Sequence, residues 1–70
     1  MIDKLEKKYH IRIRDDSFFS MTGQYLKRYK IYTADGCPWE NGLSYKGLLE
    51  ECIQHKDAFL KIYEKVNGGR

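Results

Sequence analysis

Cysteine is scarce in this chain, which has only Cys37 and Cys52 among its 70 residues. Two cysteines do not make the disulfide framework that holds a small secreted domain together. Long apolar segments are lacking too, because the longest stretch without a charged residue, Ser17–Leu26, is about half the length needed to cross a bilayer. Asp3 and several lysines occupy the region where a signal peptide would begin its apolar core. These absences predict a soluble, reduced, cytoplasmic protein that makes no contact with a membrane.

Side chains at spacings suited to metal binding or catalysis are also lacking. The best metal candidate pairs Cys52 with His55 on a helix and needs the distant Cys37 and His10 to complete four ligands. A small buried Cys52 beside a boundary His55 explains that pair without a metal. Cys37 as a nucleophile would need a base and an orienting group, and no motif places them beside it. We therefore expect no catalytic residue, no metal and no cofactor, and a protein that is not an enzyme.

Proline and tryptophan occur once each, and both lie in the segment Asp35–Gly42. This segment also holds Cys37 and two of the six glycines, a composition typical of turns. A basic, aromatic strand is predicted before it and an amphipathic helix after it. The segment is therefore predicted to form the corner between strand and helix, where Pro38 keeps the chain extended and Trp39 enters the core.

Periodicity in the first third of the chain predicts a helix and then a strand. Ile2, Leu5 and Tyr9 recur at helical spacing and indicate a helix of about two turns. Residues 10–14 alternate polar and apolar, which is typical of a strand with its isoleucines facing the core. The next segment, Ser17–Gly23, is too apolar for a free loop, so it forms either a short middle strand or an anchored connection.

A second strand is predicted over Gln24–Ala34, and alternation divides its residues between two faces. One face holds Tyr25, Lys27, Tyr29, Ile31 and Thr33, and the other holds Leu26, Arg28, Lys30 and Tyr32. Both faces mix charged and apolar side chains. The sequence therefore does not identify the face that meets solvent.

The strongest periodic signal comes from the C-terminal part of the chain, where Ser44 is a candidate helix N-cap. The apolar residues that follow form one broad stripe: Tyr45, Leu48, Leu49, Cys52, Ile53, Phe59, Leu60, Tyr63 and Val66. We expect one unbroken helix. The alternative is a break at Lys56, with Asp57 capping a second segment. Residues 68–70 are predicted to be a frayed tail.

These elements predict one small α+β domain spanning residues 1–70, with a short N-terminal helix, a two- or three-stranded antiparallel sheet and a long C-terminal helix packed on the sheet. The expected core residues are Ile11, Ile13, Ile31, Trp39, Leu48, Leu49, Cys52, Phe59, Leu60 and Tyr63. A chain this short has a thin core and small net stability. Additional burial against a partner or a second copy is therefore expected.

Positive charge is concentrated in the N-terminal half, since residues 1–35 hold eight Lys and Arg against five acids, whereas residues 36–70 hold five of each. The candidate nucleic-acid-binding residues are Arg12, Arg14, Lys27, Arg28, Lys30, Tyr25 and Tyr29, with Tyr32 interleaved among them. Strands that carry such residues can enter a major groove or stack on bases. However, Lys27 lies on the face opposite Arg28 and Lys30, and the first strand can align with only one of these sets. The alternative is a solvated strand edge whose charges discourage edge pairing.

The segment Tyr29–Gly42, YKIYTADGCPWENG, resembles small uncharacterised proteins encoded on conjugative transposons of Gram-positive bacteria. This resemblance implies no known activity and no known site residues. The order of a hairpin followed by a helix is similar to that of the arm-binding domains of tyrosine recombinases, which bind DNA through a sheet.

Two classes of function follow from the sequence. It favours a non-enzymatic protein interaction module or small homo-oligomer, because a thin core, many tyrosines and a long helix leave apolar surface for a partner. The alternative is a nucleic-acid-binding accessory protein that uses a basic, Tyr-rich hairpin. Salt separates the two, since phosphate binding weakens steeply as salt rises and apolar association does not.

Overall fold

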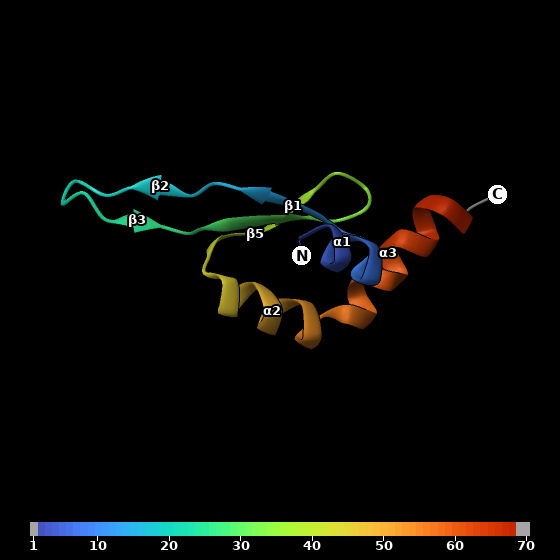
Figure 1. The fold of residues 1–70 in the computed structure, drawn as a ribbon. Coiled ribbons are helices and arrows are strands. Elements are labelled where there is room, and N and C mark those ends of the chain that lie inside the picture. Colours follow the sequence, from blue (N-terminus) through green and yellow to red (C-terminus); the bar gives the residue numbers. More distant parts are fainter. Residues whose placement is uncertain (1, 69–70) are drawn as a thin grey trace.

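The computed structural model describes residues 2–68, which form an α+β fold with the helices gathered on one side of the strands (Figure 1). In chain order the elements are α1 (Ile2–Tyr9), β1 (Arg12–Asp15), β2 (Phe18–Phe19), β3 (Tyr25–Leu26), β4 (Tyr29–Tyr32), β5 (Pro38–Leu43), α2 (Tyr45–Gln54) and α3 (Lys56–Gly68). The predicted α+β class, with a C-terminal helix packed on the sheet, is confirmed. Gly68 belongs to α3, and residues 69–70 of the predicted tail lie outside the described residues.

The strands make a three-stranded antiparallel sheet in the order β1-β4-β5 and a separate two-stranded pair, β2-β3. One register runs through both, because every step from Arg12↔Tyr32 to Phe19↔Tyr25 moves by one residue on each strand. Strands β2 and β3 therefore extend β1 and β4 outward as a hairpin, which we call the arm (residues 16–28). The arm projects beyond the helices (Figure 1) and contributes to a molecule 51 Å long and only 19 by 17 Å across.

The third strand of the sheet, β5, lies in the segment that the sequence predicted as a strand-to-helix corner, so that prediction was wrong. The turn spans residues 33–36, so only Asp35 and Gly36 of the predicted corner belong to it; the Gly36 N–H donates to the carbonyl of Thr33, and Gly36 has a φ of +85°. Glycine adopts this left-handed φ without steric cost. From Pro38 onward the chain is extended and pairs with β4 through two register shifts. The corner itself is shorter and consists of Ser44, the residue between β5 and α2.

The C-terminal helix is broken at His55, so the expectation of one unbroken helix was wrong and the alternative break near Lys56 is the observed one. Ser44 caps α2 as predicted, since its side chain accepts a hydrogen bond from the Gly47 N–H at 3.1 Å. Helix α2 lies under β4 and β5, whereas α3 turns away to contact α1 (Figure 1). The break lets both segments bury apolar residues on a small body.

The core lies between the sheet and the helices and consists of Ile11, Tyr29, Ile31, Leu48, Cys52 and Phe59. Five of these were predicted. Ile13 and Trp39 are partly buried against this cluster, and Leu49 and Tyr63 are partly buried. Leu60 is 41% exposed, which contradicts its predicted place in the core. Phe59 is fully buried, so its neighbour Leu60, about 100° further round the helix, faces outward.

Helix α1 is tied to the edge strand β1 by Glu6, whose carboxylate accepts a hydrogen bond from the Ile13 N–H at 2.8 Å. The connection passes through His10, a non-glycine residue with a φ of +58°. The imidazole of His10 stacks on the Tyr63 ring, with 3.9 Å between the ring centroids. This stacking joins the start of the sheet to α3.

Candidate nucleic-acid interface

The β1–β4 register decides which of the predicted basic residues share a face. Arg12 is paired with Tyr32 and Arg14 with Lys30, and the Asp16 N–H donates to the Arg28 carbonyl at 2.9 Å. Directly paired residues in an antiparallel ladder point to the same side. We call this set, Arg12, Arg14, Asp16, Arg28, Lys30 and Tyr32, the basic face.

The basic face lies on the side of the sheet opposite the core. Residues of the alternate parity on β4, Tyr29 and Ile31, are buried toward the helices, so Lys30 and Tyr32 point the other way. Within residues 2–68 no helix covers this side (Figure 1). Arg12 and Arg14 are exposed, and Arg28 and Lys30 are partly exposed. The cations of the basic face are therefore open to a ligand larger than a side chain.

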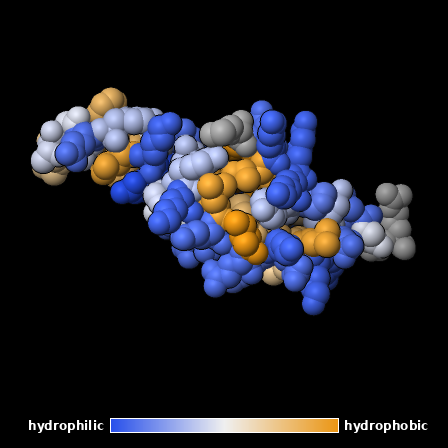
Figure 2. All heavy atoms as spheres, turned by 60° about the horizontal axis from the view of Figure 1, so that its bottom comes forward, coloured by the Kyte–Doolittle hydropathy of each residue, from blue (hydrophilic) through white to orange (hydrophobic). Residues whose placement is uncertain are grey.

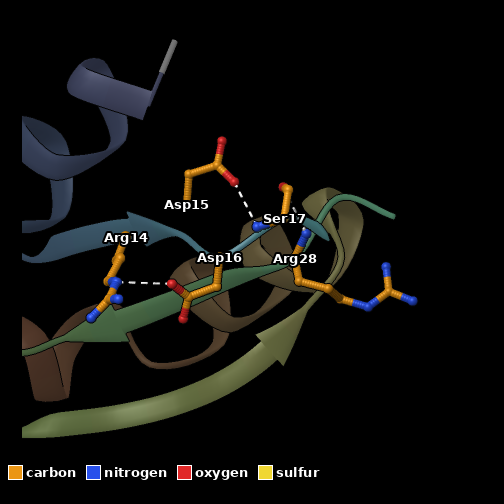
Figure 3. Close-up of polar contacts among 5 residues, drawn as sticks. All are labelled: Arg14, Asp15, Asp16, Ser17 and Arg28. Carbon is orange, nitrogen blue, oxygen red and sulfur yellow. Dashed lines mark hydrogen bonds and ion pairs between the residues drawn. The ribbon is translucent and has the colours of Figure 1, made fainter. Parts of the chain in front are cut away.

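Local contacts hold several of these charged groups in place (Figure 3). The Arg14 Nε lies 2.8 Å from an Asp16 carboxylate oxygen, and both groups are exposed. The Arg28 guanidinium donates to the backbone carbonyl of Lys27 at 2.7 Å, and its backbone N–H donates to the Ser17 hydroxyl at 3.1 Å. Arg14 thus has its charge partly balanced, whereas Arg28 keeps a full positive charge.

Tyr32 lies between Arg12 and Lys30 on the basic face. The Lys30 Nζ is 5.0 Å from the centroid of the Tyr32 ring. Hydrogen bonding by Lys30, and then by Arg14, lowers the pKa of the Tyr32 phenol from its ordinary value. Cations that favour the phenolate also favour any other anionic oxygen placed among them. The phenol therefore marks a position where a phosphate oxygen would be stabilised.

The structure places the remaining predicted residues elsewhere. Lys27 has the opposite parity and lines a hollow on the helix side together with Ile2, Asp3, Tyr29 and Tyr45. Tyr29 is only 6% exposed and belongs to the core, so its ring is not available for stacking on a base. Tyr25 lies on the arm, 51% exposed, with its ring centroid 5.0 Å from that of Phe19. The one member of the basic face that the sequence analysis missed is Asp16, which shares the even-numbered spacing of Arg12 and Arg14.

The two cysteines considered for a metal site lie in different surroundings, one at the surface and one in the core. Cys37 is exposed, and its pKa is raised by a hydrogen bond with Asp35. Cys52 is buried in the core, where desolvation raises the pKa of its thiol to about 11. Within residues 2–68 no three side chains of the His, Cys, Asp or Glu type gather in a cluster that could hold a metal ion.

Comparison with known protein families, with curated proteins and with solved structures found no match. In the part of the chain that the structure describes, no helix combines the length and apolar character needed to span a membrane.

Proposed function

We propose that this protein is a non-enzymatic binding protein that holds double-stranded DNA through the basic face. The observation that carries the proposal is the continuous register of β1 with β4, which aligns Arg12 and Arg14 with Lys30 and Arg28. Four cations less one carboxylate give this face a charge of +3, equal to the formal net charge of the whole chain. Alternation alone left open whether Arg12 and Arg14 align with Lys27 or with Arg28 and Lys30. The register aligns them with Arg28 and Lys30.

The shape of the basic face favours duplex DNA over duplex RNA. The major groove of B-form DNA admits a two-stranded β-ribbon, whereas the deep, narrow major groove of A-form RNA does not. Strands β1 and β4 are neighbours in the three-stranded sheet, with β5 on the other side of β4, and their even-numbered residues lie together on the open face with the helices behind it. Arg12, Arg14 and Lys30 bind phosphates, and the Tyr32 hydroxyl donates a hydrogen bond between them. Backbone contacts of this kind give affinity without sequence preference.

Salt dependence of duplex binding tests the proposal. Three or four phosphate contacts predict that the affinity falls roughly 40- to 150-fold between 50 and 200 mM salt, from a slope of about −0.9 per contact. We expect Arg12→Ala or Lys30→Ala to flatten the slope of log K against log salt by about one, as measured by fluorescence anisotropy with a labelled 20-base-pair duplex.

Lys61→Ala is the matched control, because it removes the same charge from an exposed position on α3. Equal losses in Lys30→Ala and Lys61→Ala would show that net charge alone attracts the DNA. No salt-dependent binding at about 100 μM protein would rule the function out, because non-specific DNA binding at physiological salt is typically tighter than this.

We also propose a reduced, cytoplasmic setting, and the two free cysteines support it. The resemblance of residues 29–42 to proteins of Gram-positive conjugative transposons supports an origin on a mobile element. Both proposals agree with a role at DNA, and neither requires a cofactor.

A further inference from the structure

The arm carries most of the exposed apolar surface of the described residues. Seven large hydrophobic side chains are exposed, and four of them, Phe18, Phe19, Met21 and Tyr25, belong to the arm. Figure 2 shows hydrophobic side chains at the surface of the arm, apart from those on the helices. Exposed apolar groups that cluster in this way mark an interaction site.

The arm is apolar on both faces and carries no charge toward its tip. The pairs Phe18↔Leu26 and Phe19↔Tyr25 are adjacent in the register, so they lie on opposite faces. Residues 17–26 contain no charged side chain. A tight turn closes the tip, where the Gly23 N–H donates to the Ser20 carbonyl at 2.9 Å. Residues 17–26 lack cations, unlike the basic face, whose Asp16 and Arg28 lie at the base of the arm, so DNA is an unsuitable ligand for the outer part of the arm.

We propose that the arm docks on the arm of a second copy of this chain, forming a two-fold symmetric dimer. Two-fold contacts bring the same patch together from both subunits. An uncharged apolar patch is complementary to itself, whereas the rest of a chain with a net charge of +3 repels its copy. The arm is therefore the surface on which two identical chains meet at the least electrostatic cost.

The exposed area of the arm predicts a weak dimer. Phe18, Phe19 and Tyr25 are 48%, 70% and 51% exposed, and Met21 is fully exposed. Because Phe18 lies on the face opposite Phe19 and Tyr25, one contact buries only Phe19 and Tyr25 with Met21 at the tip. At roughly 200 Å² for each fully exposed side chain, two arms would then bury about 900 Å² in all. Specific interfaces begin at about 1,200 Å², so we expect reversible association in roughly the micromolar to submillimolar range.

Sedimentation velocity at about 5 to 500 μM chain, in about 50 and 500 mM salt, tests the dimer. We expect the average mass to rise with concentration from that of the 8.4 kDa monomer and to rise no less at high salt, because screening weakens the repulsion. Phe19→Ser should abolish the rise. Ile53→Ser, which removes an exposed apolar side chain from α2, should preserve it.

Circular dichroism of each variant verifies the fold, and Met21→Ser replaces Phe19→Ser if the latter unfolds. A chain that is monomeric at 500 μM, or that loses association equally in Ile53→Ser, overturns the proposal. The proposal is also overturned if the chain stays monomeric and a photo-crosslinking residue at position 19 captures a different protein. Failure here is distinct from failure of DNA binding, because Phe19→Ser leaves the basic face intact and Arg12→Ala leaves the arm intact.

Discussion

The Trp39 indole links β5 to the break between α2 and α3, and its removal should expose how the two halves of the fold depend on each other. The indole Nε1–H donates to the Glu51 Oε1 at 3.1 Å. Its ring centroid lies 5.0 Å from that of Phe59 and 5.3 Å from that of His55, both edge to face. The His55 Nε2 also lies 3.4 Å from the Glu51 Oε1. One carboxylate therefore joins the strand to the helix break.

The expected magnitudes follow from half-burial of the Trp39 side chain. Full truncation of a buried aromatic costs about 3–5 kcal/mol, so Trp39→Ala should cost about 2–3 kcal/mol here. Trp39→Phe keeps the ring contact and loses the hydrogen bond to the Glu51 carboxylate. Because that bond is partly exposed, its loss should lower the free energy of unfolding by about 1 kcal/mol. A domain of this size has only about 4–10 kcal/mol of stability, so either loss is measurable.

A double-mutant cycle isolates the hydrogen bond. Urea unfolding followed by far-UV circular dichroism gives the free energies of Trp39→Phe, Glu51→Ala and the double variant, with an expected coupling of about 1 kcal/mol. Glu50→Ala is the control, since Glu50 is an exposed neighbour on the same helix and should show no coupling. A coupling below about 0.3 kcal/mol for the Glu51 pair would refute the reasoning.

Two further predictions concern His10 and Asp35. His10→Ala and His10→Gly both lose the stacking on Tyr63, but only glycine adopts the φ of +58° without strain. Urea unfolding should therefore find the glycine variant about 1 kcal/mol more stable than the alanine variant. Equal stabilities would contradict a strained connection. Hydrogen bonds from the Thr33 hydroxyl and then the Cys37 N–H lower the pKa of Asp35 below its ordinary 3.8. Its stabilising effect is therefore present above pH 4 and lost as the pH falls through the lowered pKa. Asp35→Asn should lower the midpoint of urea unfolding at pH 7 and flatten its acid dependence, and superimposable pH profiles would show that the turn does not depend on this carboxylate.

Local signals in the sequence determined several elements correctly. Alternation over residues 10–14 located β1, and the strand predicted over Gln24–Ala34 covers β3 and β4, which the structure separates at residues 27–28. Ser44 identified the start of α2, because its side chain satisfies a free N–H of the first turn. The basic residues of the candidate interface were also found from the sequence, and Lys27 was correctly separated from Arg28 and Lys30 by parity alone.

Only the tertiary structure decided which side of each strand meets solvent and which strands pair. Strand β5 contains proline, asparagine and glycine and has little propensity for a strand, so its backbone hydrogen bonds to β4 are what define it. Tyr29 entered the core because it shares the face of β4 that packs on the helices, and Leu60 left it because its neighbour Phe59 occupies the buried side of α3. Arg12 and Arg14 joined Lys30 because register is a contact between segments distant in sequence, and no single segment contains that information.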